Sequence, residues 1–530
     1  MRRLMLSTEG RITLYVMLVL AAQMLVYRAK VWYPDRDISM DSPYHITMAD
    51  LFGQIAWRRT FPATYQSVWA THFADKELGF HLLLCSLRRW AGLFGYRGAA
   101  PPFVLETGCL LLGLVIAFLA AMHVLRMRQA FVFLPVLIFA FPLFTLRMDM
   151  VRPHCVSVIL MMLTAALLAE GTGGARLLWR MGVLGFLFSY FHSNPHFVLL
   201  PTGCYALMAF PERRWRACLP TLAAAAGVVA GLTLHPQCPN TFLIWKIQCV
   251  DVPWQTLTHA VPEILPPMEL LRPERAVLVS NLALPILALA ALGGAVWRSR
   301  QGRPVTWATR LFLWLAMVSL MGFLLSKRMI EYAAPFAVMA AAMVYRDAFG
   351  SRPLRFHLAC LGAALALGLA LTPLHLDYQD APGVPIPRQF AAWVRERLPP
   401  GARIALFRWD DFPQVFFAAP EYSYSYGLDP MFAYAADPAG YGRIERIFGL
   451  LEPMPPGTEL GRLFQARLLY VSVRHHGLAR YLAQSGVALA YQGVDGWCFD
   501  LEAPPMDHHI PGPLPALRRV AGPLRTPQGQ

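Results

Sequence analysis

The segment at residues 40–45 (MDSPYH) gives the clearest indication of chemistry in this sequence, and it follows the first long apolar run, residues 12–31. Charge near the boundary of a lipid bilayer is costly and is retained mainly where it has a function. Asp41 is therefore a candidate general base or metal ligand, with His45 one helical turn later if Pro43 begins a helix. The alternative is structural, because an Asp that precedes such a helix can serve as its N-cap.

Asp75 and Glu77 form a second acidic group, flanked by His72 and Lys76 and followed by His81. Carboxylates at this spacing can take part in acid and base catalysis. They can equally mark a solvated helix N-terminus, where the helix dipole favours negative charge. The predicted catalytic residues are Asp41, Asp75 and Glu77.

Cations at other predicted helix ends are candidates for phosphate binding. Arg152 can hold a phosphate, or it can simply pair with Asp149. Lys327 and Arg328 are adjacent cations in an outer turn, where basic residues are otherwise few, and this favours a phosphate-binding role. The predicted substrate-binding residues are His45, His81, Arg152, His154, His196, Lys327, Arg328 and Glu331.

The histidines are numerous enough to suggest a divalent metal, but no spacing specifies one, so the cofactor stays unknown. Nine cysteines are scattered along the chain without a zinc-type pairing. Cys238 and Cys249 share one predicted outer loop. They can form a disulfide if that compartment is oxidising, or remain two thiols.

Composition excludes an ordinary soluble enzyme. Of the 530 residues, 56% are hydrophobic and only 15% are charged. Such a chain is typical of a polytopic membrane protein with a soluble appendage. The formal net charge of +15 lies in clusters between apolar runs. We attribute it to membrane topology and expect no nucleic-acid partner.

Apolar runs of about the length of a membrane span predict about eleven transmembrane helices within residues 1–375. The runs are residues 12–31, 103–125, 130–146, 155–169, 178–191, 196–210, 217–234, 277–297, 308–326, 331–345 and 356–374. Arginine clusters occupy alternate connections, which places those connections and the N-terminus in the cytoplasm. The alternation holds if residues 78–95 form an amphipathic or half-inserted helix that does not cross the bilayer.

The remaining connections then face outward, which in a double-membrane bacterium is the periplasm. They include an outer loop at residues 32–102 and the long connection 235–276. Their ionisable residues are a mixture of carboxylates, imidazoles and cations, as a polar cavity open to one face requires. The sequence thus predicts a multi-pass protein of the bacterial cytoplasmic (inner) membrane.

The composition changes after about residue 375, where short helices and strands alternate. Helices are predicted at 386–398 and 476–484, and strands at 403–407, 467–473, 487–491 and 497–501. This alternation predicts a small periplasmic α/β domain at residues 376–502. Residues 503–530 are rich in proline and are predicted to be an irregular tail.

Asp41 and the residues after it resemble the first-loop acidic motif of the GT-C superfamily of integral-membrane glycosyltransferases. That superfamily includes the oligosaccharyltransferase catalytic subunit, the protein O-mannosyltransferases and the lipid A aminoarabinose transferases. Asp75 with Glu77 resembles its second acidic motif, and the order of elements is similar along the full length. Residues 408–413 (RWDDFP) and 426–430 (YGLDP) resemble the C-terminal segments of bacterial proteins of this type, and they differ from the WWDYG acceptor-binding motif of oligosaccharyltransferases.

The resemblance implies a glycosyltransferase (EC 2.4 class) that moves a sugar from a polyprenyl-phosphate or -diphosphate donor to a periplasmic or envelope acceptor. The acceptor is a lipid, a glycan or a protein, and the resemblance specifies neither it nor the sugar. A carboxylate then takes the proton of the attacking group, while cations or a metal stabilise the departing phosphate. The alternative is a non-catalytic membrane protein: a transporter or flippase, or a polysaccharide-assembly partner. A transporter usually shows repeated halves and ionisable residues near mid-membrane.

Overall fold

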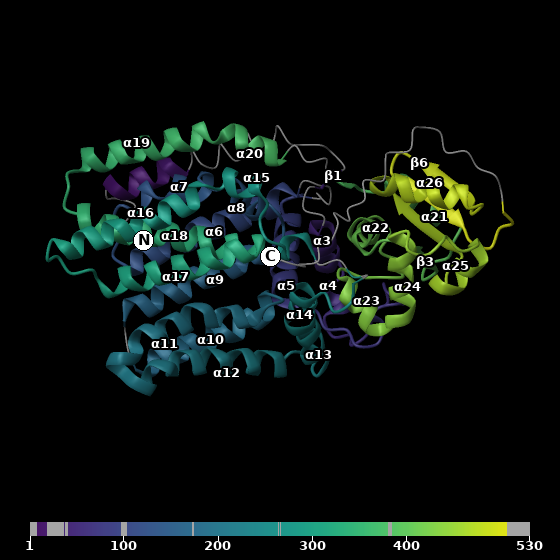
Figure 1. Ribbon diagram of the computed structural model, residues 1–530, viewed down its shortest axis with the longest axis horizontal. Coiled ribbons are helices and arrows are strands. Elements are labelled where there is room, and N and C mark those ends of the chain that lie inside the picture. The colour runs from purple at the N-terminus through teal and green to yellow at the C-terminus, as the bar shows by residue number, and fades with distance from the viewer. Residues whose placement is uncertain are drawn as a thin grey trace, which may run out of the picture. The chain divides into compact units, whose positions relative to one another are not determined.

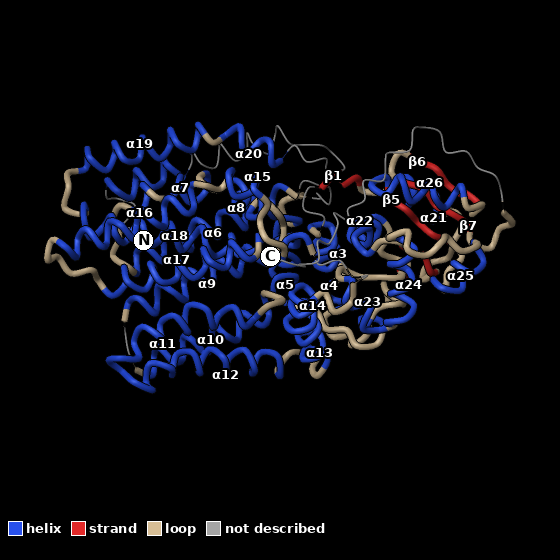
Figure 2. Tube along the Cα trace, in the orientation of Figure 1, coloured by secondary structure: helices blue, strands red, loops and turns tan. Residues whose placement is uncertain are grey.

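The computed structural model describes residues 8–17, 36–37, 41–96, 103–171, 174–262, 264, 267–379 and 384–505. The chain divides into two compact units, of which the first is Met1–Phe61 with Thr71–Val384 and the second is Pro62–Ala70 with Pro385–Gln530. The first unit is built from helices, and the second contains a five-stranded sheet (Figures 1 and 2). Most of the predicted tail, residues 506–530, lies outside the described residues.

The first unit has this order of elements. Its first half contains β1 (Arg36–Asp37), α3 (Ser42–Asp50), α4 (Phe52–Ile55), α5 (Leu78–Gly92), α6 (Val104–Val124), η2 (Ala130–Val132), α7 (Leu134–Phe139), α8 (Pro142–Met148), α9 (His154–Glu170), α10 (Ala175–Phe191), η3 (Pro195–Val198) and α11 (Leu199–Arg213). Its second half contains η4 (Arg214–Cys218), α12 (Leu219–Thr233), α13 (Asn240–Lys246), the π-helix η5 (Ile247–Asp251), α14 (Val252–Thr258), η6 (Met268–Leu270), α15 (Arg275–Ser280), α16 (Ala283–Arg300), α17 (Trp307–Leu325), η7 (Lys327–Met329), α18 (Ile330–Phe349), α19 (Leu354–Ala370) and α20 (Thr372–Gln379).

Among the described residues, three helical stretches are long and apolar enough to cross a membrane, namely Val104–Val124, Pro195–Thr233 and Trp307–Leu325. A fourth is added if the bent pair Ala130–Phe139 and Pro142–Met148 counts as one span. The prediction of about eleven transmembrane helices is therefore wrong. Of the first predicted span, residues 12–31, only residues 12–17 are described, and they are helical.

The difference has physical causes, because the apolar runs are helical but many fall short of a span. α9 and α19 have 17 residues each, roughly 26 Å at 1.5 Å per residue, against a hydrocarbon core of about 30 Å. The run at 130–146 is broken by a bend of 89°. The runs at 196–210 and 217–234 lie in one helical stretch, Pro195–Thr233.

Hydrogen bonds gather the predicted cytoplasmic connections at one end of this unit. Arg346, near the end of α18, donates to the carbonyl of Leu125, and Arg298 of α16 donates to the carbonyl of Asp347. Asp347 also accepts from Thr309 at the start of α17, at 2.7 Å. α18 has 20 residues, about 30 Å of helix, so its other end, where Glu331 lies, is far from this cluster.

The close approach of α10 and α12 depends on glycine. A Cβ added to Gly185 would lie 2.1 Å from the carbonyl oxygen of Ala224, and one added to Gly227 would lie 2.0 Å from that of Gly182. Any side chain at either position would force the two helices apart. This contact fixes the direction of α10, which ends next to His192.

The second unit is a mixed sheet with short helices. Its helices are η1 (Val68–Ala70), α21 (Arg388–Arg395), η8 (Trp409–Asp411), α22 (Phe412–Ala418), α23 (Pro430–Ala436), α24 (Pro438–Phe448), α25 (Gly457–Phe464), η9 (Val473–His475) and α26 (His476–Gln484), and its strands are β3 (Arg403–Leu406), β4 (Ser423–Tyr424), β5 (Leu468–Ser472), β6 (Ala488–Gly493) and β7 (Gly496–Asp500). A two-residue strand, β2 (Val384–Pro385), lies at the boundary between the units. The sheet order is β4-β3-β5-β7-β6. β3 runs parallel to β4 and β5, whereas β7 is antiparallel to β5 and β6.

The helices and strands predicted for this region are confirmed, and the structure adds β4 and the helices α22, α23, α24 and α25. The four predicted strands correspond to β3, β5, β6 and β7, and α26 has the predicted bounds. Because β3 and β5 are parallel neighbours, the segments after their carboxyl ends lie at the same edge of the sheet.

Candidate functional site

Asp41 stands at the N-cap position of α3, but its side chain makes no capping hydrogen bond. Its Oδ2 instead lies 2.7 Å from Nη2 of Arg152, and its side chain is 25% exposed. Burial raises the pKa of Asp41 above its usual value, and the positive charge of Arg152 opposes that rise. The structure therefore replaces the N-cap interpretation with a carboxylate of raised proton affinity, which suits a general base.

His45, His81 and Asp75 form a buried hydrogen-bonded chain that joins α3 to α5. Asp75 Oδ2 lies 2.7 Å from His81 Nδ1, and His81 Nε2 lies 2.9 Å from His45 Nδ1. Since a carboxylate only accepts, His81 donates from Nδ1 to Asp75, and its Nε2 faces His45. Burial, followed by the neighbouring His81, holds the pKa of His45 well below its usual value.

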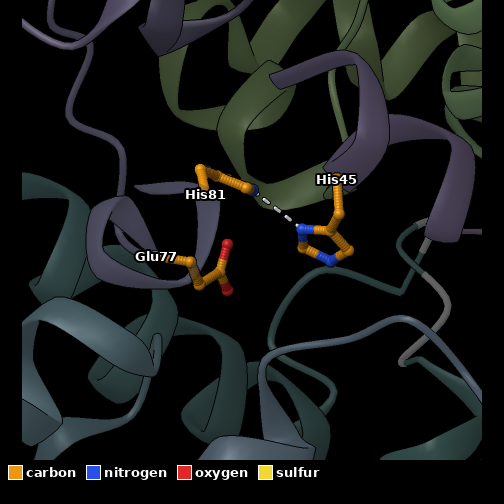
Figure 3. Close-up of side chains that lie close together, drawn as sticks. All are labelled: His45, Glu77 and His81. Atoms are coloured by element: carbon orange, nitrogen blue, oxygen red, sulfur yellow. Dashed lines mark hydrogen bonds between the residues drawn. The ribbon is translucent and has the colours of Figure 1, made fainter. Parts of the chain in front are cut away.

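Glu77 completes a set of possible metal ligands with His45 and His81 (Figure 3). One ligand atom from each residue lies within 4.8 Å of the others, and all three side chains are buried. Glu77 Oε2 is buried without a hydrogen-bond partner among the described residues. Two imidazoles and one carboxylate suit a divalent cation such as Zn²⁺, and Asp75 behind His81 is a typical partner of a metal-bound histidine. These residues therefore fit a metal that would take the place of the hydrogen bond between His81 Nε2 and His45, and no spacing in the sequence had specified it.

Three arginines, Arg147, Arg152 and Arg328, form a second group that we call the arginine triad. They converge on Glu269 of η6, whose carboxylate oxygens lie 3.1 Å from Arg147 Nη2, 3.5 Å from Arg152 Nη1 and 3.2 Å from Arg328 Nη1. Burial acts to raise the pKa of Glu269, but the triad holds it well below its usual range. Arg147 also donates from Nε to Glu331, at 2.6 Å. The end of α8, the segment before α9 and the start of α18 thus form one network of charges.

Of the other predicted substrate-binding residues, His154 lies next to this network, whereas Lys327 has a different partner. His154 is buried, with its Nε2 2.5 Å from the carbonyl oxygen of Arg147 and its Nδ1 4.0 Å from Glu331. Lys327 pairs with Glu274 at 2.5 Å, outside the triad. His196 lies on η3 with a buried Nδ1 that has no hydrogen-bond partner among the described residues.

Two of the structural alternatives can now be compared with the structure. Arg152 pairs with Asp41 and Glu269. Asp75 and Glu77 are each only 3% exposed, so they are not a solvated helix N-terminus. Of the two alternatives for the cysteines, the structure has the free thiols, because no disulfide joins Cys238 and Cys249.

Residues that the sequence did not single out hold the site in place. The buried Gln237 accepts from the Asp75 backbone N–H at 2.5 Å and donates to the carbonyl of Ile55 at 3.2 Å. Arg88 pairs with Asp50 at 2.9 Å and with the buried Glu106 at 2.7 Å, which ties α5 to α3 and α6. Glu269 was also not identified from the sequence as a site residue. The one feature that could have indicated it is that this carboxylate lies in the long connection 235–276, which was predicted to face outward.

The second unit contains another cluster, at the carboxyl ends of β3 and β5. Asp410, Asp411 and His475 each place one possible ligand atom within 4.8 Å of the others. Arg474, however, already pairs with Asp410 at 3.3 Å and with Asp411 at 2.8 Å. Ser472 donates to Asp411 at 2.6 Å. Because these carboxylates are neutralised within the unit, they form a structural ion network.

No family model and no curated protein sequence matches this chain. Among the solved structures that resemble it in fold, two are of an oligosaccharyltransferase from Archaeoglobus fulgidus. The crystal structure of the apo form has a TM-score of 0.60 and 11% identity and covers 92% of this chain and 74% of its own. The chain has a GT-C fold. A structure of the same enzyme, AglB, with an inhibitory peptide and a dolichol-phosphate has a TM-score of 0.55 and 12% identity with the same coverage.

The GT-C resemblance predicted from Asp41 and its neighbours is thus confirmed at the level of the fold. At 11% and 12% identity the comparison extends no further than the fold. One fold can support different chemistries, so the chemistry of this chain depends on its own side chains.

Proposed function

We propose that this protein is a membrane glycosyltransferase that moves a sugar from a polyprenyl-phosphate or -diphosphate donor to a periplasmic or envelope acceptor. The observation that carries the proposal is the ion pair of Asp41 with Arg152, because it joins a carboxylate of raised pKa to a group of three arginines. A glycosyl transfer needs both parts: a base for the acceptor and positive charge for the departing phosphate. The GT-C fold and the dolichol-phosphate bound to AglB support the choice of a lipid-linked donor.

Each part of the site has a role in this proposal. Asp41 takes the proton of the acceptor as that group attacks the anomeric carbon with inversion, and the bond to the donor phosphate breaks. The arginine triad stabilises the negative charge on the leaving phosphate. A divalent cation held by His45, Glu77 and His81 would supply further positive charge at this step. Asp75 orients His81 for that task.

The proposal is tested by mass spectrometry of lipid-linked sugars and envelope glycans in a strain that lacks the protein. We expect one polyprenyl-linked sugar to accumulate and one glycan decoration to disappear. Both should be restored by the wild-type chain and not by Asp41→Asn. If Asp41→Asn restores the decoration fully, Asp41 is not the catalytic base; if loss of the protein changes neither the lipid-linked sugars nor the glycans, the protein is not the transferase.

We further propose the membrane arrangement predicted from the arginine clusters. It comprises a transmembrane domain over 1–375 with the outer loop 32–102, a periplasmic domain over 376–502 and a tail over 503–530. Gln301 and Val494 are exposed, and Val494 is 79% exposed. With a membrane-impermeant thiol reagent on intact cells, we expect additional labelling of Val494→Cys and none of Gln301→Cys. Labelling of Gln301→Cys alone would reverse the orientation.

A further inference from the structure

Glu269 differs from the other carboxylates around the arginine triad, because it bonds to all three arginines at once. Asp41 pairs with Arg152, and Glu331 pairs with Arg147. Glu331 is fully buried, whereas the Glu269 side chain is 23% exposed. Glu269 is therefore a partly exposed carboxylate that all three arginines share. Asp41 and Glu331 each pair with only one of these arginines.

The triad offers more donors than Glu269 uses. Arg328 Nε is buried and has no hydrogen-bond partner among the described residues, although Nη1 of the same side chain bonds to Glu269. Two carboxylate oxygens serve three guanidinium groups, whereas a phosphate offers additional acceptor oxygens and a larger negative charge. The donor set thus matches a phosphate better than the carboxylate that it now holds.

Glu269 occupies the donors that a phosphate would need. Its carboxylate oxygens bond to Arg147 Nη2, Arg152 Nη1 and Arg328 Nη1. A phosphate that is to bond to these same donors must therefore displace the Glu269 carboxylate.

The backbone at Glu269 is anchored, so a displacement needs only the side chain to rotate. The Glu269 carbonyl accepts from the Ser326 hydroxyl at 3.3 Å, and the Leu271 carbonyl accepts from the Lys327 N–H at 3.0 Å. The Glu269 side chain is 23% exposed, and once its ion pairs open, the rotation itself is fast compared with enzymatic turnover.

We propose that Glu269 is an internal stand-in for the donor phosphate: its carboxylate holds the arginine triad together until a polyprenyl phosphate takes its place. The inference rests on the proposed function, because it assumes that the triad binds the phosphate of a lipid-linked donor. Glu269 then also acts as a selectivity element, since an anion that bonds less strongly than its carboxylate cannot displace it.

The test is the affinity of the purified full chain for farnesyl phosphate in detergent, measured by isothermal titration calorimetry. Glu269→Gln keeps the size of the side chain and removes the competing charge, so we expect its dissociation constant to fall about tenfold, as for the loss of one charge-assisted competitor. Asp251→Asn is the matched control. It removes one carboxylate from the same outer connection, where Asp251 pairs with Lys246 at 2.8 Å, and it should leave the affinity unchanged.

Each outcome decides one point. Equal or weaker binding by Glu269→Gln, with a binding wild type, makes Glu269 a permanent structural partner and leaves the proposed donor intact. Absence of binding in both chains overturns the stand-in and the proposed donor together.

Inorganic phosphate as a second titrant shows which part of the ligand is recognised. If Glu269→Gln binds inorganic phosphate more tightly than wild type does, the phosphate headgroup suffices. If its affinity rises for farnesyl phosphate alone, the lipid tail is required. Glu269→Asp, which keeps the charge but shortens its reach, should bind more tightly than wild type if Glu269→Gln does not fold.

Discussion

Two clusters of carboxylates, arginines and histidines lie in this protein, one in each unit, and burial has different consequences in them. At Asp41 burial is the larger influence, and it raises the pKa even though Arg152 opposes it. At Asp410 burial also acts to raise the pKa, but a histidine and two arginines outweigh it and hold the pKa well below its usual range. Similar sets of residues therefore leave one carboxylate with a raised pKa in the first unit and another with a lowered pKa in the second.

The comparison shows that the number of cations around a carboxylate decides whether its pKa is raised or lowered. Asp41 has one arginine as its direct partner, and that arginine is shared with Glu269. Asp410 lies within 4.0 Å of Arg408, Arg474 and His475. A group that stays ionised at all ordinary pH values stabilises a fold well and makes a poor base.

The largest expected effect is that of Asp41→Asn on turnover. Asn is similar in size but takes no proton, so we expect transferase activity to fall by about a hundred- to ten-thousand-fold, the usual contribution of a positioned base. Thermal unfolding should be nearly unchanged, because Asp41 makes no capping bond. Retention of more than about a tenth of wild-type turnover would mean that Asp41 is not the base.

Asp411→Asn is the matched change in the second cluster. Asp411 has a side chain only 1% exposed and accepts from Ser472 and Arg474. Removing one partner of a buried pair costs about 3–5 kcal/mol of stability. We expect a lower melting temperature by calorimetry, with normal turnover in the fraction that remains folded. A turnover defect without loss of stability would assign catalysis to the second cluster.

A smaller effect is expected from Arg328→Ala on donor binding. A lost charge-assisted contact to phosphate costs about 1.5–3 kcal/mol, or roughly ten- to a hundredfold in affinity. Lys327→Ala is the comparison, because Lys327 pairs with the half-exposed Glu274, and such pairs contribute about 0–1 kcal/mol. Equal losses in titrations of the two variants with a lipid-linked sugar would contradict the assignment of phosphate binding to the triad.

The smallest expected effect is a shift in the pH profile. Asp41 must be ionised to act as a base, so activity should fall as the pH drops through its raised pKa. Arg152 lowers that pKa, and Arg152→Gln should raise it further and move the acid limb of the rate profile to higher pH. Profiles of turnover against pH for both chains measure this shift. An acid limb that stays in place or moves to lower pH would show that Arg152 does not control the ionisation of Asp41.

Part of the site could be predicted from the sequence because it depends on local order. Asp41 and His45 are four residues apart and lie on one helix, and Asp75, Glu77 and His81 lie in one turn and the helix that it begins. The pairing of Arg147 with Glu331 joins residues 184 apart, and that of Arg152 with Glu269 joins residues 117 apart. The hydrophobic periodicity of the sequence cannot predict such pairings, because they depend on how the helices pack.

The sequence by itself determined the apolar helical runs of the first unit and four of the strands of the second unit, since hydrophobic spacing and turn residues act over a few residues. It also determined which segments carry carboxylates and which carry arginines. Only the tertiary structure decided that Asp41 faces Arg152, that Glu269 enters the arginine triad, and that the helix ends form two opposite groups. The physical reason is that a charge acquires its role from its neighbours and its burial, and both are set by packing between segments that are distant in the chain.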